Sequence, residues 1–260
     1  MVLVQEISPT KFEVLPKMQN IPSKKIIIFS GAGISAESGI KTFRDADGLW
    51  ENHRIEDVCN QHTWLQNYDL VHKFYNQRRI QLADVEPNYA HEVVANIQKA
   101  YPNECIIITQ NVDDLFERAG CKNVIHVHGE LTKMECSSCS HIFDIGYKAF
   151  TDQGSCPQCS SSHIKPFIVF FGGQAPKYMD MYDAFRHLQN EDSIVVVIGT
   201  LGNVVQINAN LEIVECHKIL NNLEESPYID ATQFEQVYYE EATSAAPKIQ
   251  HYIEETLNFV

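Results

Sequence analysis

The sequence predicts an α/β fold, in which a doubly wound parallel sheet is joined to a smaller lobe with helices and a metal site. Short apolar runs alternate along the chain with amphipathic stretches, a pattern typical of parallel strands connected by helices. Two Cys-x2-Cys pairs lie in a Ser-rich stretch that interrupts this alternation. A chain of 260 residues can bury a core of this kind without cross-links.

The expected strands are short apolar runs, which favour a sheet buried on both faces. They cover residues 24–29, 105–109, 124–127, 168–171, 193–198 and 217–220. The expected helices have apolar residues at helical spacing and cover residues 89–100, 112–119, 179–188 and 246–257. Pro102 and Gly120 lie just beyond the ends of the first two helices, as stop signals do.

Residues 45–86 and 133–164 do not follow this alternation. The first stretch looks helical and irregular, and the second holds the paired cysteines. We expect the two stretches to pack together as a small lobe that leaves a cleft against the sheet. The larger lobe then takes about residues 20–44, 87–132 and 165–260, and both belong to one domain over residues 1–260.

The paired cysteines predict a structural zinc site. They are Cys136-x2-Cys139 and Cys156-x2-Cys159, with residues 140–155 between the pairs. Each pair presents two thiolates, and four thiolates complete the tetrahedron that a closed zinc site needs. The alternative is a set of disulfides or redox pairs, which suits an oxidising compartment.

Charge and the first residues bear on partners and location. Lys plus Arg number 20 and Asp plus Glu number 34, so the formal net charge is −14. An acidic surface disfavours nucleic acid and membranes, which are anionic, so we expect neither as a partner. Residues 1–20 lack the apolar core of a signal peptide and the composition of a transit peptide. We expect a cytoplasmic monomer.

A glycine turn follows the first expected strand, in the stretch Gly31-Ala-Gly-Ile-Ser-Ala36. It fits a relaxed form of the dinucleotide fingerprint, in which backbone N–H groups approach a phosphate. Such turns also serve packing alone, and that alternative is equally open. Thr42-Phe43-Arg44 adds an aromatic face and a fixed cation just beyond the turn.

Polar residues follow two further strands, where ligands of open α/β sheets bind. Gln110, Asn111 and Asp113 offer hydrogen-bond donors and acceptors, although Asp113 is also placed to cap a helix. In His126-Val-His128 the two imidazoles point to opposite faces of a strand, so a shared metal is not expected. His128 is the candidate proton acceptor, while a structural histidine is the more common case.

The stretches GAGISAESGIKTFRDADGLW, TQNVDDL and HVHGEL, with the cysteine pairs, Gly199-Thr200 and Asn222-Leu223-Glu224, together resemble the sirtuin family of NAD-dependent protein deacylases. These motifs occur in the family's order over roughly residues 24–245. The resemblance implies a Rossmann-like domain plus a small zinc-ribbon and helical lobe, with NAD and an acyl-lysine protein or peptide meeting in the cleft. It also implies a transferase that moves the acyl group to ADP-ribose, releasing lysine and nicotinamide.

The resemblance implies roles for individual residues. His128 is the implied general base, with Asn111 and Asp113 as further catalytic residues, and one structural zinc is held by the four cysteines named above. The residues implied in binding NAD are Gly31, Ala32, Gly33, Ile34, Ala36, Thr42, Phe43, Arg44, Trp50, Gln110, Asn111, Gly199, Thr200, Leu201, Asn222, Leu223, Glu224 and Ala242.

The stretch FYNQRR, residues 74–79, resembles the family branch that removes acidic acyl groups such as succinyl and malonyl. Tyr75 and Arg78 share one face of a helix, where a phenol and a guanidinium can clamp a carboxylate. Acetyl-lysine remains a possible substrate as well. The alternative is a solvated basic helix face, because Arg79 is also present. The implied substrate-binding residues are Ala46, Tyr75, Arg78, Val169, Phe171 and Gly172.

The chain departs from the family pattern at Leu201, Gln206 and Gly173, where Ser, Pro and Glu are usual. Three other functions stay open: ADP-ribosyl transfer or NAD hydrolysis at the same site, a catalytically weak binding module, which the departures at Leu201 and Gly173 favour, and a dehydrogenase.

Overall fold

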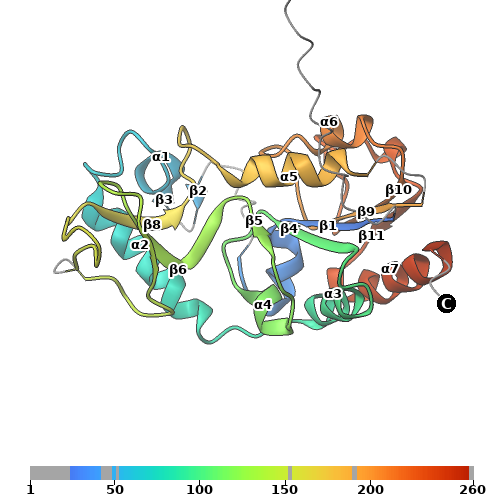
Figure 1. Ribbon diagram of the computed structural model, residues 1–260, viewed down its shortest axis with the longest axis horizontal. Coiled ribbons are helices and arrows are strands. Elements are labelled where there is room, and N and C mark those ends of the chain that lie inside the picture. Colours follow the sequence, from blue (N-terminus) through green and yellow to red (C-terminus); the bar gives the residue numbers. More distant parts are fainter. Residues whose placement is uncertain (1–23, 42–48, 51–52, 152–153, 189–191, 258–260) are drawn as a thin grey trace, which may run out of the picture.

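The structure is a computed structural model that describes residues 24–41, 49–50, 53–151, 154–188 and 192–257. Its larger part is a sheet with helices on both faces, and its smaller part lies at the other end of the long axis (Figure 1). The expected α/β fold is confirmed. Among the described residues, no helix has the length and apolar character that crossing a bilayer requires.

The main sheet has six strands in the order β11-β10-β9-β1-β4-β5, and every neighbouring pair is parallel. The strands are β1 (Ile26–Ser30), β4 (Cys105–Thr109), β5 (Ile125–His126), β9 (Ile194–Ile198), β10 (His217–Asn222) and β11 (Gln236–Tyr239). Strands β4 and β5 extend the sheet on one side of β1, and β9 to β11 extend it on the other. The order therefore reverses at β1 and β9, which is where doubly wound sheets bind ligands.

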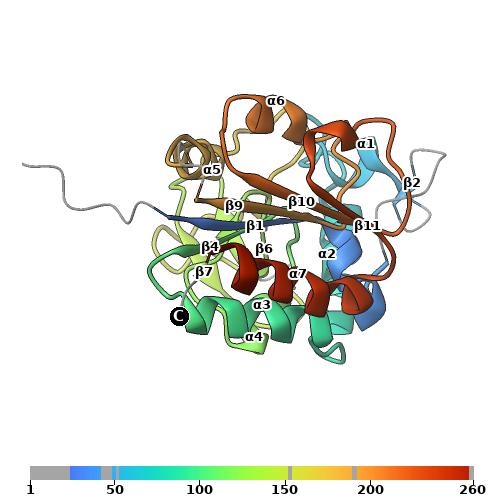
Figure 2. The same cartoon turned by 90° about the vertical axis from the view of Figure 1, so that its right-hand side faces the viewer.

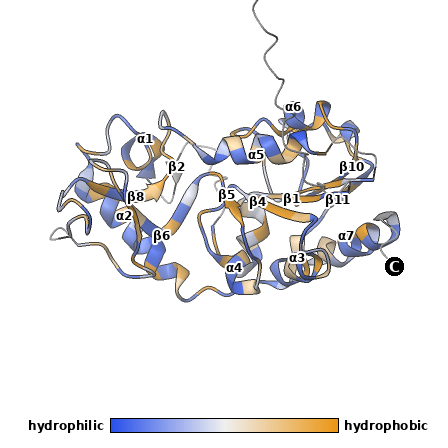
Figure 3. Cartoon of the chain, in the orientation of Figure 1, coloured by the Kyte–Doolittle hydropathy of each residue, from blue (hydrophilic) through white to orange (hydrophobic). Residues whose placement is uncertain are grey.

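Two helical layers cover the sheet (Figure 2). One contains α3 (Tyr89–Ala100), α4 (Leu115–Ala119) and α7 (Ala242–Leu257), and the other contains α5 (Lys177–Arg186) and α6 (Ile207–Glu212). Because successive side chains of a strand face opposite ways, Ile26 and Ile28 pack in the first layer, and Ile27 and Phe29 in the second. The central strands are accordingly apolar along their length (Figure 3).

The smaller part is built on a three-stranded antiparallel sheet in the order β7-β6-β8. Its strands are β6 (Gly129–Cys136), β7 (Ile142–Asp144) and β8 (Ile164–Ile168), and α2 (Tyr68–Leu82) packs against it. The remaining short elements are η1 (Ala32–Ser38), β2 (Leu49–Trp50), β3 (His53–Arg54), α1 (Ile55–Val58) and η2 (Ala231–Gln233).

The structure corrects several predicted elements. Residues 168–171 were expected as a strand of the parallel sheet, but the strand is β8, which pairs antiparallel with β6 and ends at Ile168. Strand β11 was not predicted, α4 begins at Leu115 rather than Val112, and α7 begins at Ala242 rather than Ala246. The small sheet also takes in residues 129–132 and 165–168, which the prediction gave to the larger lobe.

Candidate active site

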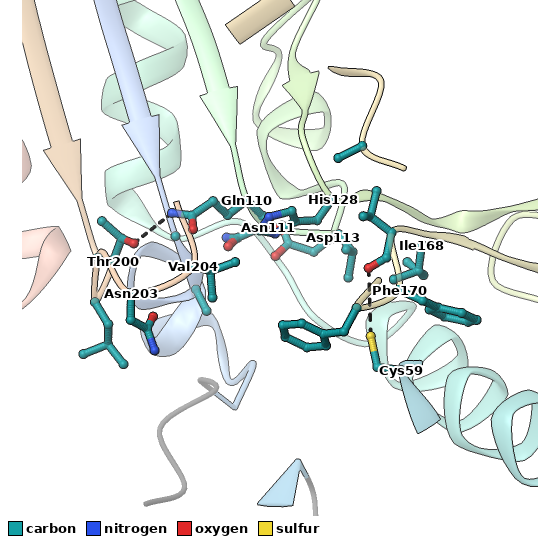
Figure 4. A pocket seen from close by; sticks show the side chains of 18 of the residues that line it. Cys59, Gln110, Asn111, Asp113, His128, Ile168, Phe170, Thr200, Asn203 and Val204 are labelled. Carbon is teal, nitrogen blue, oxygen red and sulfur yellow. Dashed lines mark hydrogen bonds between the residues drawn. The ribbon is translucent and has the colours of Figure 1, made fainter. Parts of the chain in front are cut away.

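A cavity of about 400 Å³ lies beyond the carboxyl ends of β1, β4, β5 and β9. In Figure 4, Gln110, Asn111, Asp113 and His128 lie along it, with Thr200 on one side and Phe170 and Cys59 on the other. Most of the residues predicted to act in catalysis or to bind NAD or substrate, and described in the structure, line this cavity. They are Gly31, Ala32, Gly33, Gln110, Asn111, Asp113, His128, Val169, Phe171, Gly172, Gly199, Thr200 and Leu201.

The glycines bring the loops after β1 and β9 into direct backbone contact. The Gly33 N–H donates to the Gly199 carbonyl at 2.8 Å, and the Gly31 N–H donates to the Ile198 carbonyl at 2.9 Å. A Cβ at Gly33 would lie 2.5 Å from the Gly199 Cα, closer than any side chain allows. Packing, the alternative role predicted for this motif, is thus real, and the same loops also line the cavity.

Ser35, for which the sequence predicts no role, lies at the centre of a buried hydrogen-bond network behind the cavity. Its Oγ accepts from Asn111 Nδ2 at 3.0 Å and donates to Asp113 Oδ2 at 3.1 Å. His91 Nε2 lies 3.4 Å from the same Oγ. The signal was present, because Ser35 is the one hydroxyl between Gly33 and Ala36 of the glycine motif.

Asp113 caps a helix, as predicted, and it also lies at the cavity. Its Oδ1 accepts from the Leu115 N–H at 3.2 Å at the start of α4, and the residue also lines the cavity. Burial raises the pKa of the Asp113 carboxyl to about 6, against the opposing bonds from Leu115 and Ser35. The carboxyl is thus close to its titration point near neutral pH.

His126 and His128 have different surroundings, as their spacing predicted. His126 contacts the Asn111 carbonyl and Glu117, each at 3.0 Å. Burial opposes its charge, but the Glu117 carboxylate leads the contacts that raise its pKa. His126 is therefore a structural residue.

His128 lines the cavity, and its Nδ1 lies 3.0 Å from the Gln110 carbonyl. Because a carbonyl only accepts, Nδ1 carries the proton and Nε2 keeps a lone pair. Burial lowers the pKa of His128, against the effect of the Gln110 carbonyl. His128 is thus a neutral imidazole at pH 7 and can accept a proton at Nε2.

Asn222 was predicted to contact the cofactor, but its side chain is committed to the loop after β9. It accepts from the Thr200 N–H at 3.0 Å and donates to the Thr200 carbonyl at 2.9 Å. The Thr200 hydroxyl in turn accepts from Gln110 Nε2 at 2.8 Å. Asn222 therefore holds a cavity-lining residue in place from behind.

Some predicted residues lie away from the cavity lining or outside the described residues. Ile34 is buried in the core and Ala36 is exposed, Leu223 and Glu224 are exposed, and Ala242 is buried at the start of α7. Thr42, Phe43, Arg44 and Ala46, and the side chain of Trp50, lie outside the described residues.

Tyr75 and Arg78 lie behind the cavity wall. Tyr75 is fully buried against Phe170, which lines the cavity, with ring centroids 6.0 Å apart. The Cys59 thiol lines the cavity and is a hydrogen-bonding neighbour of Tyr75. Arg78 covers the Phe74 ring, 3.2 Å from its centroid, and donates to the Phe74 carbonyl at 2.7 Å.

The alternative of a solvated basic face on α2 is wrong, because Arg79 is fully buried. Its Nε donates to the Leu131 carbonyl and its Nη1 to Asn76 Oδ1, each at 2.7 Å. Burial lowers its pKa to about 10, so it stays charged at pH 7. Arg79 fixes α2 to the small sheet.

The four paired cysteines converge on one point. Their sulfur atoms all lie within 4.8 Å of one another, and Sγ of Cys136 and Cys159 are 3.6 Å apart, as are Sγ of Cys139 and Cys156. Ligands about 2.3 Å from a tetrahedral zinc stand about 3.8 Å from each other, whereas a disulfide bond is about 2.0 Å. The donor set fits one structural zinc. Each pair is followed by a serine in the left-handed region, Ser140 at φ 58° and Ser160 at φ 60°.

Comparison with known proteins gives a consistent result. The model of the Sir2 family matches residues 31–206. The NAD-dependent protein deacylase of Helicobacter hepaticus is 47% identical over 251 residues, which cover 89% of this chain and 98% of the relative. The enzyme of the same name from Campylobacter jejuni is 43% identical over 226 residues, covering 87% and 94%.

Solved structures agree with these relatives. A Sir2 homologue in complex with NAD is 32% identical, with a TM-score of 0.77 over 90% of this chain and 91% of the other. A mutant Sir2 homologue in complex with ADP-ribose is 31% identical, with a TM-score of 0.77 over 91% and 94%.

Proposed function

This chain belongs to the Sir2 family, and from that premise we propose that it is an NAD-dependent protein deacylase that removes acidic acyl groups, succinyl or malonyl, and also acetyl, from lysine. The observation that carries the proposal is His128, a neutral base whose Nε2 faces a cavity between the glycine loop and residues 168–173. The relatives' name supports the deacylase activity, and the surroundings of Tyr75 support the acyl class.

The cavity residues fit NAD as a co-substrate. Gly31 and Gly33 line the cavity at the strand-order reversal, where doubly wound sheets bind dinucleotides, and Gln110 and Asn111 offer amides beside it. When bound, NAD would supply the ADP-ribose that accepts the acyl group, and with one water consumed the products would be lysine, nicotinamide and O-acyl-ADP-ribose. His128 would take a proton from a ribose hydroxyl at Nε2, and the cavity would hold the reacting groups together.

Residues 169–173 form the wall where an acyl-lysine peptide would lie. The Val169 N–H donates to the His128 carbonyl at 2.9 Å, and the Phe171 N–H donates to the Cys59 carbonyl at 3.0 Å. A Cβ at Gly173 would lie 2.9 Å from the Phe170 carbonyl, so the loop as folded favours glycine where the family usually has Glu. Residue 173 thus shapes this wall through its lack of a side chain.

The acyl preference follows from the end of the cavity near Cys59. Behind Cys59 and Phe170 stand the Tyr75 phenol and, on the same helix face, Arg78. Among the acyl groups on lysine, a succinyl or malonyl chain carries a carboxylate, and we propose that this carboxylate displaces Phe170 to form charge-assisted hydrogen bonds with the pair. An acetyl group makes no use of them.

The test combines an acyl-peptide panel with one substitution. Succinylated, malonylated and acetylated peptides with NAD are followed by mass spectrometry, in the native enzyme and in Arg78→Met. We expect kcat/KM for desuccinylation to fall about 10- to 100-fold in Arg78→Met, as loss of a charged hydrogen bond predicts. Deacetylation should change less than about threefold, and the exposed Arg186→Met serves as the matched control.

Other outcomes contradict specific parts of the proposal. Equal losses on both peptides would reject the carboxylate clamp. ADP-ribose formed without lysine release would favour NAD hydrolysis, and ADP-ribose attached to protein would favour transfer. Binding without turnover would favour a binding module.

The same proposal covers location and assembly. A site of four thiolates needs reduced cysteines, which the cytoplasm maintains, and we propose a monomeric enzyme there with acyl-lysine proteins as its partners.

A further inference from the structure

Nε2, the proton-accepting atom of His128, already accepts a hydrogen bond. Nδ1 donates to the Gln110 carbonyl, so Nε2 has one lone pair in the plane of the ring. The Tyr178 hydroxyl lies 2.9 Å from Nε2. Since Nε2 can only accept in this tautomer, the phenol O–H is the donor of this hydrogen bond.

Tyr178 is held in place by its surroundings rather than by this bond alone. It lies in the first turn of α5, shortly after the cavity-lining residues 168–173, and it lines the cavity itself. Its ring packs partly buried against the core under α5 and meets the Tyr182 ring edge-on, with centroids 6.2 Å apart. Burial, with a contribution from Tyr182, raises the pKa of the hydroxyl, so it remains a donor at neutral pH.

Resting on the function proposed above, we propose that Tyr178 is a positioning residue that holds Nε2 of His128 until a ribose hydroxyl of NAD displaces it. A single lone pair accepts one strong hydrogen bond, so phenol and ribose compete for the same atom. The phenol keeps the imidazole oriented towards the cavity in the free enzyme. NAD binding must break this bond before the base can act.

Tyr178→Phe tests the proposal because it keeps the ring and removes only the hydroxyl. Calorimetric titration with NAD, without peptide, should show about two- to tenfold tighter binding than in the native enzyme, the range set by one net hydrogen bond. An NAD analogue lacking both hydroxyls of the nicotinamide ribose does not compete for Nε2, so its affinity should be equal in the two proteins. In turnover, KM for NAD should fall by the same factor.

Tyr182→Phe is the matched control, since it makes the same change one helical turn further along α5 and should leave both affinities unchanged. The Nε2 resonance in ¹⁵N-histidine spectra of the free protein should move in Tyr178→Phe and not in the control. Unchanged or weaker NAD binding in Tyr178→Phe would overturn the proposal, as would an equal gain for the analogue. If the native enzyme binds no NAD at all, the proposed function itself fails, which is a separate result.

Discussion

Acid should destabilise the protein through His91, which is fully buried in α3 beside Ser35. Burial lowers the pKa of His91 to about 4, below its ordinary value of 6.5. Between these two values the unfolded chain binds a proton that the folded chain does not. The contribution of the neutral His91 to the free energy of unfolding is therefore fully present above about pH 6.5, and it is lost as the pH falls towards 4.

The size of the effect follows from the two pKa values. At pH 5, protonation of His91 shifts the equilibrium towards the unfolded state by a factor of about thirty. This corresponds to a loss of about 2 kcal/mol in the free energy of unfolding relative to pH 7. Asp113 acts in the opposite direction, because its raised pKa of about 6 makes the folded state bind the extra proton. Between pH 7 and pH 5, Asp113 raises the free energy of unfolding by about 1 kcal/mol, which offsets much of the loss that His91 causes.

The difference between the native protein and His91→Gln separates the two effects. Urea unfolding at pH 7, 6 and 5 should show the stability advantage of the native protein shrinking by about 2 kcal/mol over this range. Loss of zinc in acid affects both proteins and cancels in the difference. An advantage that stays constant with pH would show that His91 does not keep its low pKa, and the reasoning would fail.

Three further predictions concern the base and the zinc site. His128→Ala should reduce lysine release at least about a hundredfold with an unchanged circular dichroism spectrum, and retained activity would reject its role as base. Cys136→Ser should lower the zinc content and reduce the melting temperature by about 5 °C or more, and no change in both would contradict a structural zinc. Ser160→Gly should stabilise the protein by about 1 kcal/mol in urea unfolding, because Ser160 has a positive φ. The exposed Ser155→Gly is its control, and an equal effect there would remove the explanation.

The sequence predicts the centre of the fold well and its edges poorly. Strands β1, β4 and β9 are buried on both faces, so each is a mainly apolar run, which is the pattern that predicts a central parallel strand. Strand β11 is a short edge strand, half-buried, with a mixed sequence from Gln236 to Tyr239 that carries no such signal. The strand predicted at residues 168–171 was wrong because an apolar run can line a cavity as well as fill a sheet. The true strand, β8, contains Pro166, which argues against a strand except at an edge.

The candidate site shows a similar division. Positions at strand ends, such as Gln110 and His128, are predictable because the topology brings strand ends together. Tyr178 and Cys59 come from other elements, and only the tertiary structure places them at the cavity. Asn222 shows that the position of a residue does not determine its role, because its side-chain amide hydrogen-bonds to the Thr200 backbone.

The backbone contact between the glycine loop and Gly199 has a mechanical consequence. Two chain segments that touch without side chains between them have no room to slide and no rotamer to change, so this wall of the cavity behaves as one stiff body. Among the described residues that line the cavity, widening to admit a dinucleotide would then fall more to residues 168–173 and to Tyr178, which contacts the imidazole of His128.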